Sequence, residues 1–129
     1  MKKLFTIGIV LTFIPLIPSV TTYKATEFSF TVIKAQVSAY TSSVDETDDT
    51  PFITASGTAT KLGVVACPVA IPFGTQVVIE GKSYTCEDRM NPRYQNKPVF
   101  DVWMSSKKQA FEWGRQTVQV VIYKDKTKV

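Results

Sequence analysis

Two aspartates, Asp88 and Asp101, are the residues of this sequence whose type and setting best suit chemistry. The chain contains no histidine, so acid or base chemistry near neutral pH has to use carboxylates. Both aspartates lie at the ends of predicted strands, in the segments Glu87-Asp88-Arg89 and Phe100-Asp101-Val102-Trp103. A carboxylic acid that is partly buried beside a second carboxylate has a raised pKa and can protonate a glycosidic oxygen. The pair predicts a carbohydrate-cleaving groove.

Small polar loops precede the two aspartates and can position a polymer. They are Ala39-Tyr40-Thr41, Thr54-Ala55-Ser56-Gly57 and Ile71-Pro72-Phe73-Gly74-Thr75. Hydroxyl groups in the second loop are suited to hydrogen-bonding a glycan, and aromatic rings to lining a groove. The candidate substrate-binding residues are Tyr40, Thr54, Ser56, Gly57, Arg89 and Trp103.

Each candidate also has a purely structural interpretation. Asp101 can bond backbone amides or pair with Arg89 or Arg93. Residues 54–57 can form only a tight turn, and Tyr40 and Trp103 can belong to the core. The acidic loop over 42–51 can be a solvated rim, or it can send Asp48 or Asp49 into the groove.

Length and composition predict one small exported domain. The chain has 129 residues, of which 44% are hydrophobic and 20% charged, within the usual size of a single domain. Residues 1–22 combine a basic start with an uncharged, mostly apolar run, which is typical of an export signal or a short membrane anchor. A lead-in strand at 23–36 and a β domain at 37–124 follow. Loss of Lys2 and Lys3 with the signal lowers the net charge from +4 to +2. The sequence has no basic patch interleaved with aromatic residues, the pattern that would indicate nucleic-acid binding.

The two cysteines, Cys67 and Cys86, are an even number in an exported chain and predict a disulfide. A nucleophilic cysteine needs a histidine partner, and zinc needs more ligands than two thiols. We therefore expect no metal and no cofactor.

Short β-prone runs dominate the rest of the sequence. Strands are predicted at 28–39, 64–66, 76–80, 82–86 and 117–123, with Glu80-Gly81 as a hairpin turn. One helix is predicted, with Ser105 or Ser106 as its N-cap, Gln109 as in a capping box, and Gly114 at its end. Its Ala110 and Phe111 are expected to face the core. These elements predict a small β-rich barrel or sandwich with a single helix.

The ordered set of motifs resembles the 3D domain, a family named for three aspartates. The resemblance covers about 37–123 and rests on Ala-Tyr-Thr, Thr-Ala-Ser-Gly, Ile-Pro-Phe-Gly-Thr, Glu-Asp and Asp-Val-Trp in that order. It implies a six-stranded double-psi β-barrel similar to the catalytic barrel of membrane-bound lytic transglycosylase A and of stationary-phase cell-wall enzymes of Gram-positive bacteria. It also implies peptidoglycan as the partner of a secreted or cell-envelope monomer, with membrane contact through residues 4–23 if the anchor is retained.

The resemblance assigns the catalytic roles position by position. Asp101 matches the single catalytic acid and base of the lytic transglycosylases. Asp88 matches the second aspartate of the family, and in this hypothesis it raises the pKa of Asp101 and orients it. The first aspartate falls on Cys67. An enzyme of this kind cleaves the β-1,4 bond between MurNAc and GlcNAc and leaves a 1,6-anhydro end. The change at Cys67 keeps a second hypothesis open, a barrel that binds wall polysaccharide without cleaving it.

Overall fold

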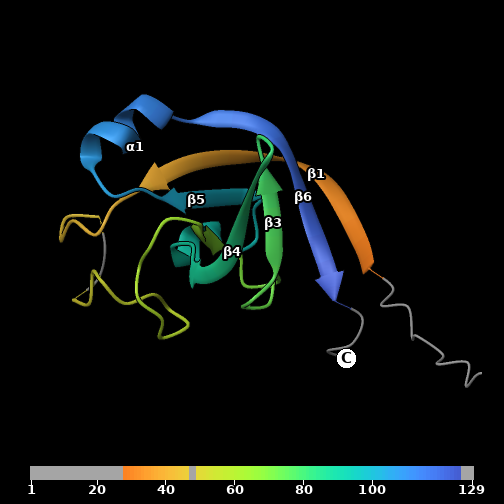
Figure 1. Ribbon diagram of the computed structural model, residues 1–129, viewed down its shortest axis with the longest axis horizontal. Helices are drawn as coiled ribbons and strands as arrows, with labels where there is room; N and C mark the ends of the chain where they lie inside the picture. The colour runs from red at the N-terminus through yellow and green to blue at the C-terminus, as the bar shows by residue number, and fades with distance from the viewer. Residues whose placement is uncertain (1–27, 47–48, 126–129) are drawn as a thin grey trace, which may run out of the picture.

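Six strands close into a barrel in the computed structural model, which describes residues 28–46 and 49–125 (Figure 1). Five of the six are rich in valine, isoleucine or aromatic residues, which favour strands. The predicted mainly β class and the single α-helix are confirmed. The strands are β1 (Phe28–Tyr40), β2 (Val64–Cys67), β3 (Gln76–Ile79), β4 (Lys82–Arg89), β5 (Val99–Trp103) and β6 (Gln116–Asp125). A 3₁₀ turn (Pro92–Tyr94) precedes β5, and α1 (Lys107–Trp113) precedes β6.

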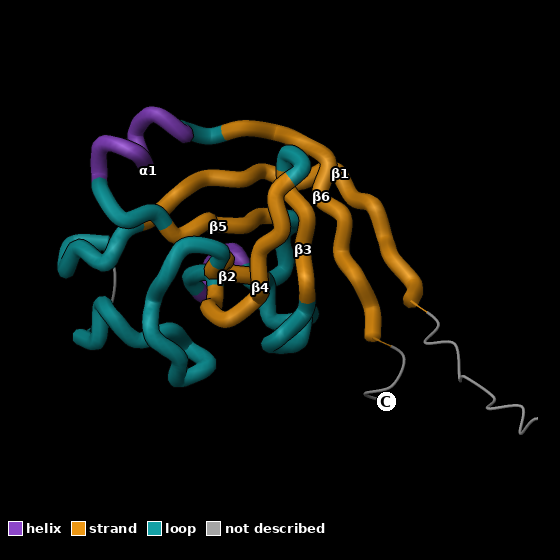
Figure 2. Tube along the Cα trace, viewed as in Figure 1, coloured by secondary structure: helices purple, strands orange, loops and turns teal. Residues whose placement is uncertain are grey.

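The strands close in the order β1-β5-β2-β4-β3-β6, and β6 returns to β1. The pairs β1/β5 and β2/β4 are parallel, whereas the other four pairs are antiparallel. Parallel neighbours cannot be joined by a tight turn, so the chain crosses over the barrel between them. The longest connection, from β1 to β2, is loop that gathers on one side of the barrel (Figure 2).

The barrel interior is filled by alternate residues of every strand. Val37, Val65, Val77, Phe100 and Val120 are fully buried there. Each such side chain contributes about 1.5 to 3 kcal/mol by leaving water. Residues between them on the strands therefore face outward, and these outward positions are the ones available for a site.

The predicted hairpin at Glu80-Gly81 is confirmed. Ile79 pairs with Lys82, and both turn residues have positive φ, 49° at Glu80 and 73° at Gly81. Two central residues with positive φ give the turn whose twist matches that of the flanking strands. The sequence carries glycine only at the second of these two positions.

The predicted helix is also confirmed, with one correction. The Ser106 hydroxyl accepts a hydrogen bond from the Gln109 amide at 3.3 Å, and the helix ends at Gly114. Phe111, expected in the core, is 80% exposed. Helical residues three apart share a face, so Trp113 and Ala110 turn toward the barrel and Phe111 points away.

The first strand is continuous across the predicted boundary between the lead-in and the domain. Residues 28–37 pair with β6, from Phe28 opposite Asp125 to Val37 opposite Gln116, so residues 28–36 belong to the barrel wall. The predicted signal or anchor segment, 1–22, lies outside the described residues. No helix within the described part of the chain has the length and apolar character to cross a membrane.

The predicted disulfide between Cys67 and Cys86 is confirmed. The two residues lie on the neighbouring strands β2 and β4, their Cα atoms are 5.9 Å apart, and both are fully buried. The bridge therefore ties the two parallel strands together from inside the barrel.

Replacing Cys67 and Cys86 together by alanine is expected to lower the free energy of unfolding by about 3 kcal/mol, because the open chain gains the entropy of a closed 19-residue span. Urea denaturation of the parent and the double variant measures the difference. The parent with its disulfide reduced keeps both sulfur atoms and serves as the control for packing. Unchanged stability in both samples would contradict the structural role given to the bridge.

Candidate functional site

The two predicted catalytic aspartates lie on either side of one small residue. In the register of the sheet, Ala66 on β2 is opposite Asp88 on β4 and opposite Asp101 on β5. Ser38 on β1 is in turn opposite Asp101. Residues in one such row project to the same face of a sheet. The backbones of Asp88 and Asp101 are two strand spacings apart, roughly 10 Å, and the methyl group of Ala66 leaves the space above it open.

A β-bulge in β4 brings Asp88 to this face. Val65 pairs with Cys86 and Ala66 pairs with Asp88. Glu87 is therefore an extra residue in β4, with no pairing partner on β2. Without the bulge, strict alternation would turn Asp88 inward, because Cys86 two residues earlier points into the core. The extra residue re-aims the strand and places Asp88 in the same row as Asp101.

A groove of about 570 Å³ lies over this row. Four of the eight predicted catalytic and substrate-binding residues line it: Tyr40, Asp88, Arg89 and Asp101. The rest of the wall comes from Asp45, Glu46, Thr50, Pro51, Ile53, Ala55, Ala66, Met90, Asn91 and Pro92. Thr54, Ser56, Gly57 and Trp103 are not among the described residues that form it.

Asp101 is partly buried and hydrogen-bonded to one neutral group, the Ser38 hydroxyl, which donates to Oδ1. Burial raises the pKa of Asp101, and the negative charge of Glu46 raises it further. The Ser38 hydrogen bond and the charge of Arg115 act in the opposite direction. We expected Asp88 to raise this pKa, but the carboxylate that does so is Glu46. A carboxyl group of this kind keeps its proton to higher pH and is suited to act as a general acid.

Asp88 is held by three donors and organises the groove. Its Oδ1 accepts from the amides of Ala55 at 3.0 Å and Arg89 at 2.8 Å, and its Oδ2 accepts from the Tyr40 hydroxyl at 2.6 Å. Burial raises the pKa of Tyr40, and the hydrogen bond to Asp88 raises it further. The phenol therefore stays protonated as a donor, and Asp88 fixes both Tyr40 and the loop at Ala55.

The turn at 54–58 uses its hydroxyl groups internally. Thr54 is only 4% exposed, and its Oγ1 lies 3.0 Å from Ser56 Oγ and 2.8 Å from Thr58 Oγ1. Glu87 holds the turn on β4, since its carbonyl accepts from the Ser56 amide and its carboxylate from Thr58. Gly57 supplies a φ of 86° at the tip. The turn therefore shapes the wall behind the groove.

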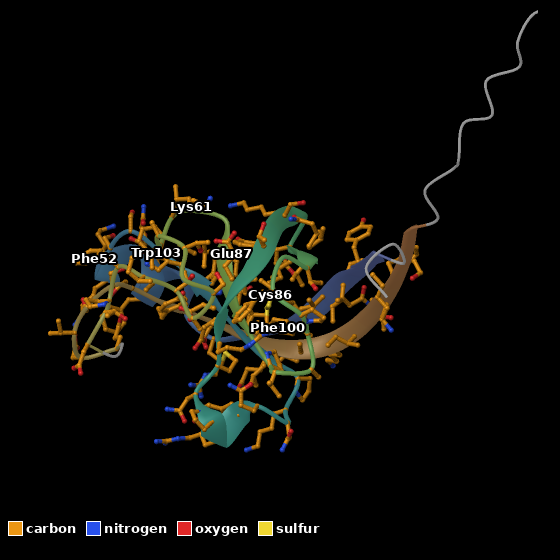
Figure 3. All side chains as sticks on the ribbon, turned by 90° about the horizontal axis from the view of Figure 1, so that it is seen from below. Phe52, Lys61, Cys86, Glu87, Phe100 and Trp103 are labelled. Carbon is orange, nitrogen blue, oxygen red and sulfur yellow. A yellow bond between two sulfur atoms is a disulfide. The ribbon has the colours of Figure 1, made fainter. Side chains whose placement is uncertain are left out.

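Arg89 and Trp103 position loops. The Arg89 guanidinium donates to the Ile71 carbonyl at 2.8 Å and lies 3.7 Å from the centroid of the Phe73 ring, although it also lines the groove. Burial lowers the pKa of Arg89. Trp103 donates from Nε1 to the Ser42 hydroxyl at 3.0 Å. Figure 3 shows Trp103, Glu87 and Phe52 on the loop side of the barrel, with Cys86 and Phe100 nearer its centre.

The sequence alone did not predict three residues of the site, Ser38, Ala66 and Glu46. Ser38 and Ala66 became visible only through strand register, whereas Glu46 stands in the acidic loop where Asp48 and Asp49 had been considered. Asp48 lies outside the described residues, and Asp49 is exposed and does not line the groove. Across 28–46 and 49–125, no three histidine, cysteine or acidic side chains gather so as to hold a metal ion.

No model of a known protein family matches the chain, and no curated protein matches it significantly.

Replacing Tyr40 by phenylalanine is expected to lower the free energy of unfolding by about 1.5 to 3 kcal/mol, because the Asp88 carboxylate loses a charge-assisted hydrogen bond. Chemical denaturation at neutral pH measures the loss. Tyr84→Phe is the matched control, because Tyr84 is also buried but its hydroxyl makes no hydrogen bond to any residue within 28–46 and 49–125. Equal effects of the two substitutions would contradict the role given to the Tyr40 hydroxyl.

Replacing Asp101 by asparagine is expected to stabilise the protein more at pH 7 than at pH 4. The pKa of Asp101 is raised in the folded state above its usual 3.8, so the parent loses stability as pH rises through this range, and the variant does not. Asp45→Asn gives the opposite trend, since Lys107 lowers the pKa of Asp45. Thermal unfolding across the pH range measures both, and a constant difference for Asp101→Asn would contradict the raised pKa.

Proposed function

We propose that this protein is a secreted or cell-envelope enzyme that cleaves peptidoglycan, acting on the β-1,4 bond between MurNAc and GlcNAc as a lytic transglycosylase. The observation that carries the proposal is Asp101, a partly buried carboxyl group with a raised pKa on the wall of a groove of about 570 Å³. The resemblance to the 3D domain supplies the substrate. The closed six-stranded barrel, with its two parallel strand pairs β1/β5 and β2/β4, supports that resemblance.

The proposed reaction needs one titrating group. Asp101 donates its proton to the glycosidic oxygen, and the bond from that oxygen to the anomeric carbon of MurNAc breaks. Asp101, now a carboxylate, takes the proton of the C6 hydroxyl of the same sugar as its oxygen bonds to the anomeric carbon. A well-oriented intramolecular hydroxyl has an effective molarity on the order of 10⁵ M or more, so no water and no second catalytic carboxylate are required. Asp101 thus ends the cycle protonated, as it began, and the cleaved MurNAc carries a 1,6-anhydro end.

The groove offers the other contacts that the reaction needs. Tyr40 presents a phenol that is held as a donor, and Arg89 adds a positive charge. Pro51, Ile53 and Met90 give apolar surface against which sugar rings can pack. In this proposal Asp88 holds the Tyr40 hydroxyl and the Ala55 loop in place and takes no proton.

A second candidate function is a barrel that binds wall polysaccharide without cleaving it. Two observations favour it. Cys67, at the position of the family's first aspartate, is used in the disulfide, and both oxygens of Asp88 are engaged by donors of the protein itself. Both hypotheses place the glycan in the same groove and differ only in whether Asp101 transfers a proton.

Mass spectrometry of peptidoglycan digested by the full, disulfide-bonded chain tests the proposal. The parent is expected to release fragments with 1,6-anhydro ends, and Asp101→Asn to release none, because the amide is too weak an acid to protonate the glycosidic oxygen. Glu112→Gln on the exposed face of α1 removes one negative charge far from the reacting groups and should retain activity. Ordinary reducing ends would indicate hydrolysis, and a parent that sediments with the wall without cutting it would favour the binding barrel.

A further inference from the structure

Glu46 enters the groove from the loop after β1. It lines the same cavity as Asp101. Its Oε2 accepts from the Thr41 amide at 2.9 Å and from the Thr41 hydroxyl at 2.5 Å. Thr41 is only 4% exposed. Both bonds reach the same oxygen, and among the described residues none donates to Oε1. One oxygen thus anchors the side chain while the other remains available in the groove.

The segment just before Glu46 is held at two points. Lys107 on α1 pairs with Asp45 at 2.6 Å, directly before Glu46. Trp103 on β5 donates to Ser42 at the start of the loop. These contacts hold the Glu46 carboxylate in a defined place, although it lies outside the regular strands.

The charged groups around Asp101 differ in how far their charge is compensated. Asp88 has hydrogen bonds on both oxygens, and Asp45 is paired with Lys107. Arg115 and Arg89 are the positive groups: Arg115 acts on Asp101 through its charge, and Arg89 lines the groove while bonding to the Ile71 carbonyl. Tyr40 is a neutral donor to Asp88. Glu46 is hydrogen-bonded by the neutral donors of Thr41 and forms no salt bridge among the described residues, although its charge also interacts with that of Lys107.

We propose that Glu46, rather than Asp88, is the charged carboxylate that works with Asp101 in this groove. It is a positioning residue, which acts through Asp101, and the inference rests on the proposed function, in which Asp101 donates the proton. A nearby like charge disfavours ionisation, so Asp101 stays protonated before the glycosidic bond breaks. The same repulsion destabilises the Asp101 carboxylate after proton transfer and favours recovery of a proton from the C6 hydroxyl. One fixed negative charge thus assists both halves of the cycle.

The experiment follows the titration of Asp101 directly by carbon-13 NMR of its side-chain carboxyl in the full chain, alongside the pH profile of kcat/KM on peptidoglycan. The test variant is Glu46→Gln, whose amide oxygen can still accept from Thr41. The matched control is Glu87→Gln, which also removes one negative charge and keeps an acceptor for Thr58, outside the groove.

In Glu46→Gln the midpoint of the Asp101 titration and the alkaline limb of the kcat/KM profile are both expected to move to lower pH, whereas Glu87→Gln leaves them in place. A midpoint that Glu46→Gln does not move, or that both variants move equally, would overturn the inference. If the midpoint moves only in Glu46→Gln but the parent cleaves no glycan, the coupling of Glu46 to Asp101 stands and the proposed lytic function falls.

Discussion

The pairing of β2 with β4 on one side and β5 on the other is the constraint on which the site depends. β2 has four residues, and all of them are buried, so its register is strongly specified by the core. Because Ala66 is opposite both Asp88 and Asp101, that register sets the separation of the two carboxyl groups. A slip of β2 by one residue would turn Ala66 into the core and Val65 into the groove, where its larger side chain would occupy the space between the aspartates.

The disulfide and the bulge act on the same pair of strands from opposite faces. Cys67 and Cys86 join β2 to β4 inside the barrel, while the extra residue Glu87 lets Asp88 face outward. A bulge weakens the regular ladder locally, and a covalent bond beside it compensates for that loss. In this chain a bridge therefore stands close to the groove at the position where the resemblance implies an aspartate. Its structural contribution is to fix β4 beneath the groove.

The carboxyl groups of the groove have separate tasks, which follow from their partners. Asp88 accepts three hydrogen bonds and shapes the wall through Tyr40 and Ala55. Asp45 anchors its loop to α1. Asp101 has a single neutral donor and is partly buried, and burial of this kind favours the protonated acid. Environment rather than residue type thus distinguishes the group suited to proton transfer from the groups that support it.

Local sequence determined much of the fold and part of the site. Turn and cap residues fixed the Glu80-Gly81 hairpin and the helix between Ser106 and Gly114, because their conformational preferences act over a few neighbouring positions. The β-prone runs predicted strands. Because the sequence has no histidine, any acid or base near neutral pH had to be a carboxyl group, which indicated Asp88 and Asp101. Side-chain burial on short elements was less predictable, and Phe111 is exposed because α1 turns only one face to the barrel.

What the tertiary structure decided was proximity. Ser38 and Ala66 belong to the site only because strands distant in the sequence pair in one register, and no local pattern encodes that pairing. Strict alternation along β4 would point Asp88 into the core, and the bulge at Glu87 turns it to the outer face instead. Glu46 lies in the same groove as Asp101 because a loop folds back onto Thr41. Burial of Thr54 keeps its hydroxyl within its own turn. Composition and spacing thus determined which residue types were available, whereas long-range pairing and burial decided which of them share one groove and which carboxyl group has its pKa raised.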